Sequence, residues 1–138
     1  MFYVLDPEVA GGLGPNTVMD ASSHPPVVTT LHYELDGWLG DELLESFPCF
    51  IVTENMRHLI ESARPSGCSF GAVLVSTSER FKELYPMRHL PRFFWLKIAG
   101  EAGYDDFGIS STNSLVISQR VLQAMKKGVL EHCAVQAL

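Results

Sequence analysis

Short apolar runs that end at a hydroxyl residue recur along the chain, and each leads into apolar residues at helical spacing. These units cover residues 50–63, 73–85 and 115–125. The hydroxyl side chain at each junction predicts the N-cap of the helix that follows, and these residues are Thr53, Ser76 and Ser118. Glu79 follows Ser76 by three residues, as in a capping box. Because the spacings differ, the pattern predicts three local strand-to-helix units and not a solenoid repeat.

The other segments alternate between β-forming runs and turn-forming residues. Residues 1–5, 27–35, 92–98 and 129–135 predict strands, and the aromatic run 92–98 predicts a central one. Residues 11–26 are rich in glycine, proline, serine and asparagine and predict the longest loop. Apolar residues between Trp38 and Phe47 recur at helical spacing up to Pro48, which predicts a further short amphipathic helix.

These elements predict an α+β fold, with a mixed or mostly antiparallel sheet and about four helices packed on it. The 138 residues are near the usual size of one domain, so we expect a single domain over residues 1–138. Hydrophobic residues make up 46% of the chain and charged residues 19%, a balance typical of a folded globular protein.

The charge balance narrows the classes of partner. Ten basic and sixteen acidic side chains give a net charge of −6, which opposes binding to nucleic acids and to anionic membranes. No apolar run approaches the roughly 20 residues that cross a bilayer. The first residues lack the basic region of a signal peptide, so we expect a strand there and a cytoplasmic protein.

Residues that could bind metals or phosphates do not form a recognisable motif. The three cysteines have no Cys-x-x-Cys spacing, and we expect buried thiols at Cys49, Cys68 and Cys133. Histidines also lack metal-ligand spacing, and they are His24, His32, His58, His89 and His132. The glycines of residues 11–14 precede no Lys-Ser/Thr pair, which favours a flexible loop over a phosphate-binding loop. The sequence therefore predicts no catalytic residue, no cofactor and no metal.

Two carboxylate pairs, Asp41-Glu42 and Asp105-Asp106, stand out among the acidic residues. Adjacent side chains diverge, so we expect solvated surface acid that could contact a basic partner. Trp38 lies near acidic residues and fits either an interface hot spot or the core. The predicted partner-binding residues are Trp38, Asp41, Glu42, Glu101, Asp105 and Asp106.

The C-terminal pattern consists of the acidic-aromatic turn Asp105-Asp106-Phe107, the strand 114–118 ending in serine, an apolar helix, Gly128 and a final strand. It resembles the C-terminal region of immunity proteins that accompany polymorphic and type VI secreted toxins in Gram-negative bacteria. The match covers residues 105–135 of the 138. The resemblance implies a cytoplasmic antitoxin that neutralises a cognate toxin effector by binding it, without catalysis. A nuclease toxin with a basic substrate groove is one class of such an effector.

Two other functions stay open at this point. Five histidines and two carboxylate pairs could supply the catalytic groups of a small hydrolase or metal-assisted enzyme, which requires a polar cleft. An accessory subunit or homo-oligomer could instead assemble through the aromatic residues 93–95. The sequence is compatible with a monomer and with a homodimer.

Overall fold

The five-residue strand β7 (Cys49–Thr53) is buried on both faces at the centre of the computed structural model, which describes residues 1–138. Successive strand side chains point to opposite faces, so Phe50 and Val52 enter one hydrophobic cluster and Ile51 enters a second. β7 pairs with β6 (Leu43–Ser46) and β10 (Phe93–Ile98), and β8 (Cys68–Gly71) completes this antiparallel sheet. This sheet therefore separates two cores.

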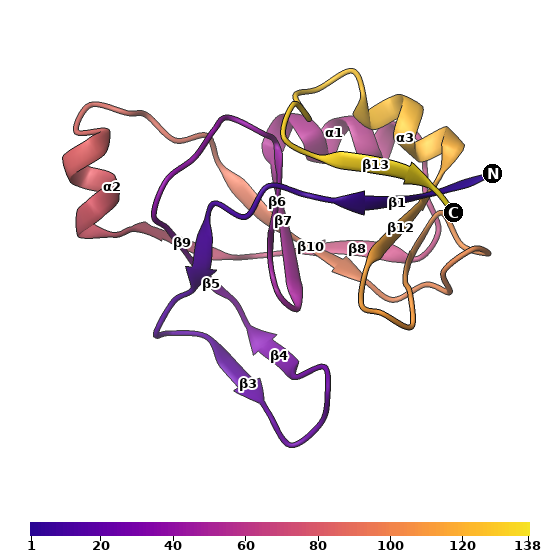
Figure 1. The fold of residues 1–138 in the computed structure, drawn as a ribbon, viewed down its shortest axis with the longest axis horizontal. Helices are drawn as coiled ribbons and strands as arrows, with labels where there is room; N and C mark the ends of the chain where they lie inside the picture. Colours follow the sequence, from indigo (N-terminus) through magenta and orange to yellow (C-terminus); the bar gives the residue numbers. More distant parts are fainter.

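The first core lies against a second antiparallel sheet and two helices. That sheet has the order β11 (Phe107–Ile109), β12 (Leu115–Ser118), β1 (Phe2–Asp6) and β13 (Ala134–Ala137). Helices α1 (Glu54–Ser62) and α3 (Gln119–Met125) contact each other and bury Met56, Ile60, Val121, Leu122 and Met125. Figure 1 shows both helices on one side of this end, with the two chain termini close together.

The second core lies under a three-stranded sheet of order β2 (Gly11–Leu13), β5 (His32–Leu35) and β9 (Leu74–Thr77). β5 and β9 are parallel, whereas the other strand pairs are antiparallel. Helix α2 (Glu79–Leu84) stands at the end of the molecule opposite to the termini (Figure 1). None of the three helices has the length and apolar character needed to cross a membrane.

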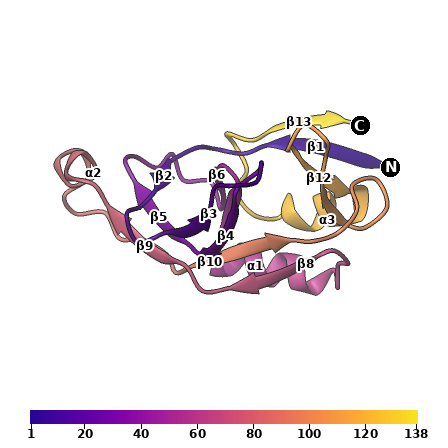
Figure 2. The ribbon, with the colours of Figure 1, turned by 90° about the horizontal axis from the view of Figure 1, so that it is seen from below.

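A separate two-stranded hairpin, β3 (Val18–Asp20) and β4 (Val27–Thr30), pairs with no other strand. Figure 1 shows it reaching away from the body below β5, and in Figure 2, seen from below, it lies in front of the middle of the molecule. Val18, Met19 and Val27 are exposed on it. Because a lone hairpin is only marginally stable in water, its position depends on contacts with the sheets behind it.

The predicted α+β class is confirmed, but the chain has three helices and not about four. Thr53 and Ser118 are confirmed as N-caps, since their hydroxyls accept the backbone N–H groups of Met56 and Val121. The capping box at Ser76 is wrong, because the β5–β9 ladder continues to Thr77 and the cap of α2 is Ser78. Glu79 is consequently the first residue of that helix.

The helix predicted between Trp38 and Phe47 is wrong. Residues 43–46 form β6, which pairs with β7 and turns at Phe47–Pro48. Leu43 faces the first core and Leu44 the second. A strand that is buried on both faces loses its period of two, so these apolar positions imitated helical spacing.

The long loop predicted over residues 11–26 is also wrong, because it contains β2 and β3. A Cβ atom at Gly11 would lie 1.9 Å from the backbone oxygen of Glu34, so this glycine permits close strand packing and is not a mark of flexibility. The strands predicted over residues 1–5 and 92–98 are confirmed, the second as the inner strand β10. The extended segment predicted over residues 27–35 is confirmed in part, because it divides at Leu31 into β4 and β5, which belong to different sheets. The final strand starts later than predicted, at Ala134.

Candidate binding site

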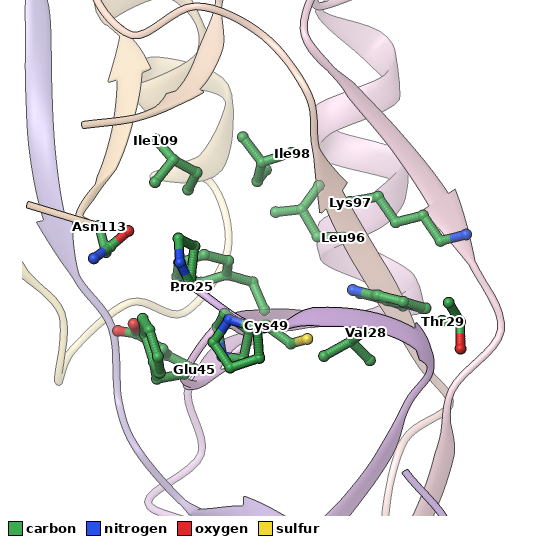
Figure 3. Close-up of a pocket in the computed structure, with 15 residues that line it drawn as sticks. Pro25, Val28, Thr29, Glu45, Cys49, Leu96, Lys97, Ile98, Ile109 and Asn113 are labelled. Atoms are coloured by element: carbon green, nitrogen blue, oxygen red, sulfur yellow. The ribbon is translucent and has the colours of Figure 1, made fainter. Parts of the chain in front are cut away.

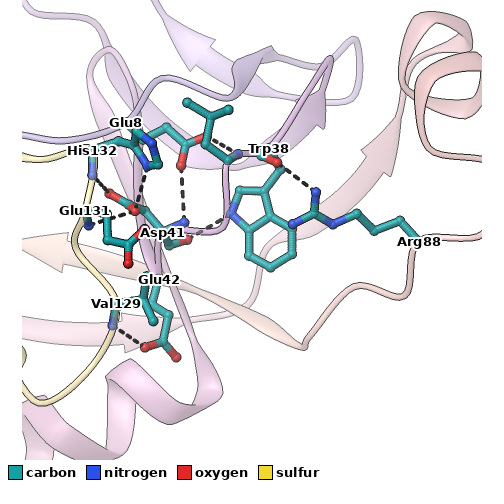
Figure 4. A network of polar contacts seen from close by, with 9 residues as sticks. Glu8, Trp38, Asp41, Glu42, Arg88, Val129, Glu131 and His132 are labelled. Atoms are coloured by element: carbon teal, nitrogen blue, oxygen red, sulfur yellow. Dashed lines mark hydrogen bonds and ion pairs between the residues drawn. The ribbon is translucent and has the colours of Figure 1, made fainter.

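Asp41, which the sequence placed on the surface, is 0% exposed. Its carboxylate accepts hydrogen bonds from the backbone N–H groups of Glu131, at 3.0 Å, and His132, at 2.8 Å. The His132 ring Nδ1 lies 3.2 Å from the same carboxylate. Figure 4 shows how these contacts attach the C-terminal segment to the loop before β6. The prediction of solvated acid is therefore wrong for Asp41, whose carboxylate joins residues 131–132 to the loop before β6.

Glu8 is the second buried carboxylate of this group. It accepts hydrogen bonds from the backbone N–H groups of Leu39, at 2.7 Å, and Asp41, at 3.2 Å. One ligand atom each from Glu8, Asp41 and His132 lie within 4.8 Å of one another, so these are the residues that could hold a metal. Every carboxylate oxygen of the group already accepts a backbone hydrogen bond, however, and this accounts for the geometry without an ion.

Glu42 and Trp38, which lie close to Asp41 in sequence, also form hydrogen bonds within the fold. The half-buried Glu42 accepts hydrogen bonds from the Val129 backbone at 2.8 Å and the Thr53 hydroxyl at 2.9 Å. Trp38 is buried, and its indole N–H donates to the Asp41 backbone oxygen at 2.9 Å. The Arg88 guanidinium covers the indole ring at 4.5 Å. Of the two interpretations of Trp38, the structure supports the core.

The second acidic pair is held in a network as well. Asp106 accepts hydrogen bonds from the Ser66 backbone and the Ser118 hydroxyl, and it pairs with Arg120 at 2.7 Å. Burial raises the pKa of Asp106, but these hydrogen bonds and the Arg120 charge outweigh burial and hold the pKa below its ordinary value. Asp105 accepts a hydrogen bond from the Glu101 backbone at 2.7 Å. Among the predicted acidic residues of this turn, Glu101 is exposed, whereas Asp105 and Asp106 are half-buried.

The histidines do not converge on one point. His32 is buried, accepts the Asn16 backbone N–H at Nδ1 and contacts the Ser76 hydroxyl through Nε2 at 2.7 Å. Only His132 joins one of the carboxylate pairs. All three cysteines are free; Cys49 is buried, whereas Cys68 and Cys133 are partly exposed. Burial is the main cause that raises the pKa of each thiol to about 11, so the thiols stay protonated at neutral pH.

A cavity of about 510 Å³ lies between the β3–β4 hairpin, the β6–β7 turn and β10, and we call it the hairpin cavity. Its volume is in the range of about 300–1,000 Å³ that is usual for ligand pockets. Figure 3 shows Glu45 and Asn113 at one end, Lys97 and Thr29 at the other, and Cys49 between them. Most of the lining is apolar, and these residues include Pro25, Pro26, Val28, Phe47, Pro48, Phe50, Trp95, Leu96, Ile98 and Ile109.

Glu45 is the acidic group of the hairpin cavity. Burial raises the pKa of Glu45, and the nearby Asp6 charge raises it further, with no hydrogen bond or cation acting against them. A second cavity of about 500 Å³ adjoins Glu45 on the side of Asp6, His24, Thr112 and Gln136. The Glu45 carboxylate therefore borders an apolar cavity and a polar one.

None of the residues predicted from the sequence to bind a partner lines the hairpin cavity. A usable signal was Phe47-Pro48, since a proline between two apolar runs marks a turn as readily as a helix end. Another was Glu45, a lone charge within the otherwise apolar or hydroxyl-bearing run Leu43–Phe47. Neither signal gives the position of the β3–β4 hairpin, which closes the cavity through long-range packing.

Comparisons of the chain with protein-family models, with curated proteins and with solved structures find no match.

Proposed function

We propose that this chain is an immunity protein that neutralises a cognate bacterial toxin by binding it, as the resemblance over residues 105–135 implies. The observation that carries the proposal furthest is the apolar surface beside the hairpin cavity. The hairpin that forms one wall of this cavity also exposes Val18, Met19 and Val27, and Phe47, which lines the cavity, is exposed as well. Exposed apolar residues beside a cavity are typical of protein-binding sites. We call these four residues and the cavity the hairpin face.

The placement of the polar residues supports binding in preference to catalysis. A general acid or base must keep a free atom within reach of a substrate. In the Glu8–Asp41–His132 group, both carboxylates instead accept backbone hydrogen bonds within the fold. The three thiols have raised pKa values, which disfavours a thiolate nucleophile.

The net charge of −6 supports a basic partner. Opposite charge accelerates the encounter of two proteins and disfavours partners of like charge. A toxin with a basic groove for nucleic acid fits this requirement, and the immunity protein would act by covering that groove.

Co-expression with the toxin-like product of an adjacent gene tests the proposal. We expect the wild-type chain to restore growth and to co-purify with the toxin. Phe47→Asp should weaken both effects, because it places a charge on the hairpin face. Leu84→Asp on α2 is the matched control, since Leu84 is 55% exposed and Phe47 is 43% exposed. A wild-type chain that neither protects the cells nor binds the toxin contradicts the proposal.

A metal-assisted enzyme is the second candidate, and it rests on the proximity of Glu8, Asp41 and His132. Titration of the chain with Zn²⁺ or Mn²⁺, followed by calorimetry, separates the two candidates. The metal-assisted enzyme predicts stoichiometric metal binding that is lost in His132→Ala. The binding function predicts no stoichiometric metal binding.

A further inference from the structure

The backbone of Glu45 is hydrogen-bonded on both sides, which sets the point from which its side chain extends. Its N–H donates to the backbone oxygen of Glu8 at 2.9 Å, and the hydroxyl of the buried Tyr33 donates to its backbone oxygen at 2.9 Å. Glu45 also lies opposite Phe50 in the β6–β7 ladder. The side chain therefore leaves β6 at a defined point and lines both cavities.

No cation compensates this carboxylate. Lys97 lines the same cavity, but its ammonium lies over the Trp95 ring at 4.6 Å and, in Figure 3, extends away from the end that holds Glu45. The charge of the Asp6 carboxylate acts on Glu45 and repels it. A half-buried anion beside a second anion is destabilised, so a cation that enters here gains more than it would at an exposed carboxylate.

Because the cavity walls are apolar, a ligand that binds here needs an apolar part in addition to a positive charge. Val28 and Pro25 of the hairpin face Ile98 and Ile109 across the space that leads to Glu45 (Figure 3). Arginine and lysine combine an apolar methylene stem with a cationic head, which matches such a pocket. Arginine can also form two parallel hydrogen bonds to one carboxylate.

We propose that the hairpin cavity receives a basic side chain, arginine or lysine, from a loop of the toxin, with its cationic head against Glu45. The stem of this side chain lies between the hairpin and β10, and the head faces the side of the cavity toward Asp6. This inference rests on the proposed function and adds the anchor by which the toxin is recognised. Phe47 and Val28, which line the cavity, surround the anchor and exclude water from it.

The first experiment compares the toxin affinities of Glu45→Gln and Glu83→Gln by calorimetry. Both changes remove one negative charge, but Glu83 is exposed on α2. We expect Glu45→Gln to weaken binding by roughly 30-fold or more, and Glu83→Gln to change it less than about threefold. Circular dichroism confirms that both variants are folded. If the wild-type chain binds the toxin and Glu45→Gln binds it equally well, the anchor is disproved and the proposed function stands.

The second experiment needs no toxin and uses N-butylguanidinium, with neutral N-butylurea as its matched control. Amide chemical shifts of the ¹⁵N-labelled chain are followed during titration with each compound. We expect saturable shifts of Glu45, Cys49 and Leu96 with the cation alone, and their loss in Glu45→Gln. Equal shifts with both compounds, or shifts outside the cavity, overturn the inference. Cation binding at Glu45 together with unchanged toxin affinity in Glu45→Gln identifies a small-molecule site and also overturns it.

Discussion

The buried Asp41 and the half-buried Glu45 lie at opposite ends of one short segment and have opposite surroundings. Asp41 accepts two backbone hydrogen bonds and contacts the His132 ring. Glu45 has only the repulsion of Asp6 and the cost of burial. A buried carboxylate whose oxygens are occupied stabilises a fold, whereas one without partners is available to a ligand. Burial of acid is thus not evidence for function until its hydrogen bonds are assigned.

Asp41→Asn is the change with the largest expected effect on this comparison. The Asn amide group would point a donor at a backbone N–H that now donates to Asp41, and the attachment of residues 131–132 would be lost. We expect the free energy of unfolding to fall by about 2–4 kcal/mol in urea denaturation. Asp36→Asn, on the exposed part of the same loop, should change it by less than about 0.5 kcal/mol. Equal stability of the two variants would show that the group around Asp41 contributes little.

Asp106→Asn should have an intermediate effect, because this carboxylate joins Ser66, Ser118 and Arg120 but lies closer to the surface. We expect a loss of about 1–2 kcal/mol at pH 7. The folded-state pKa of Asp106 is lowered from 3.8, so its contribution is complete above pH 3.8 and is lost as the pH falls through the folded value. Urea denaturation between pH 7 and pH 3 should therefore show a weaker acid dependence in Asp106→Asn than in the wild type.

Glu45→Gln should have the smallest effect on stability, with the opposite sign. Since the pKa of Glu45 is raised above 4.5 in the folded state, its ionised form destabilises the fold at neutral pH. We expect the free energy of unfolding at pH 7 to stay equal or to rise by less than about 1 kcal/mol. This gain should disappear below pH 4.5, where Glu45 is protonated in both states. A clear loss of stability would mean that Glu45 has an internal role like that of Asp41.

The elements that could be predicted from the sequence are those in which local signals agree with the fold. Thr53 and Ser118 separate a β-forming run from a helical stripe, and both cap a helix. Leu43 and Leu44 led to a wrong helix prediction because β6 is buried on both faces. Leu43 faces the first core and Leu44 faces the second. Gly11 contributed to the wrong loop prediction, because glycine is used both in turns and where two strands pack closely, as it does here against Glu34.

The candidate site was harder to predict, because it depends on distant segments. Asp41 and Glu45 are both acidic residues close in sequence, and no local pattern indicates which one finds backbone N–H partners. Those of Asp41 come from Glu131 and His132, some 90 residues away. The cavity beside Glu45 needs the β3–β4 hairpin, whose Val28 packs against the second core.

Hydrogen exchange of the chain with and without its toxin tests the central claim, namely that the hairpin face is the contact surface. We predict slower amide exchange on binding in residues 18–30 and 43–50, and unchanged exchange in α2. Protection confined to residues 101–106 would instead place the contact at the acidic turn that the sequence indicated. Protection there or on α2, with none in residues 18–30 and 43–50, would contradict the account.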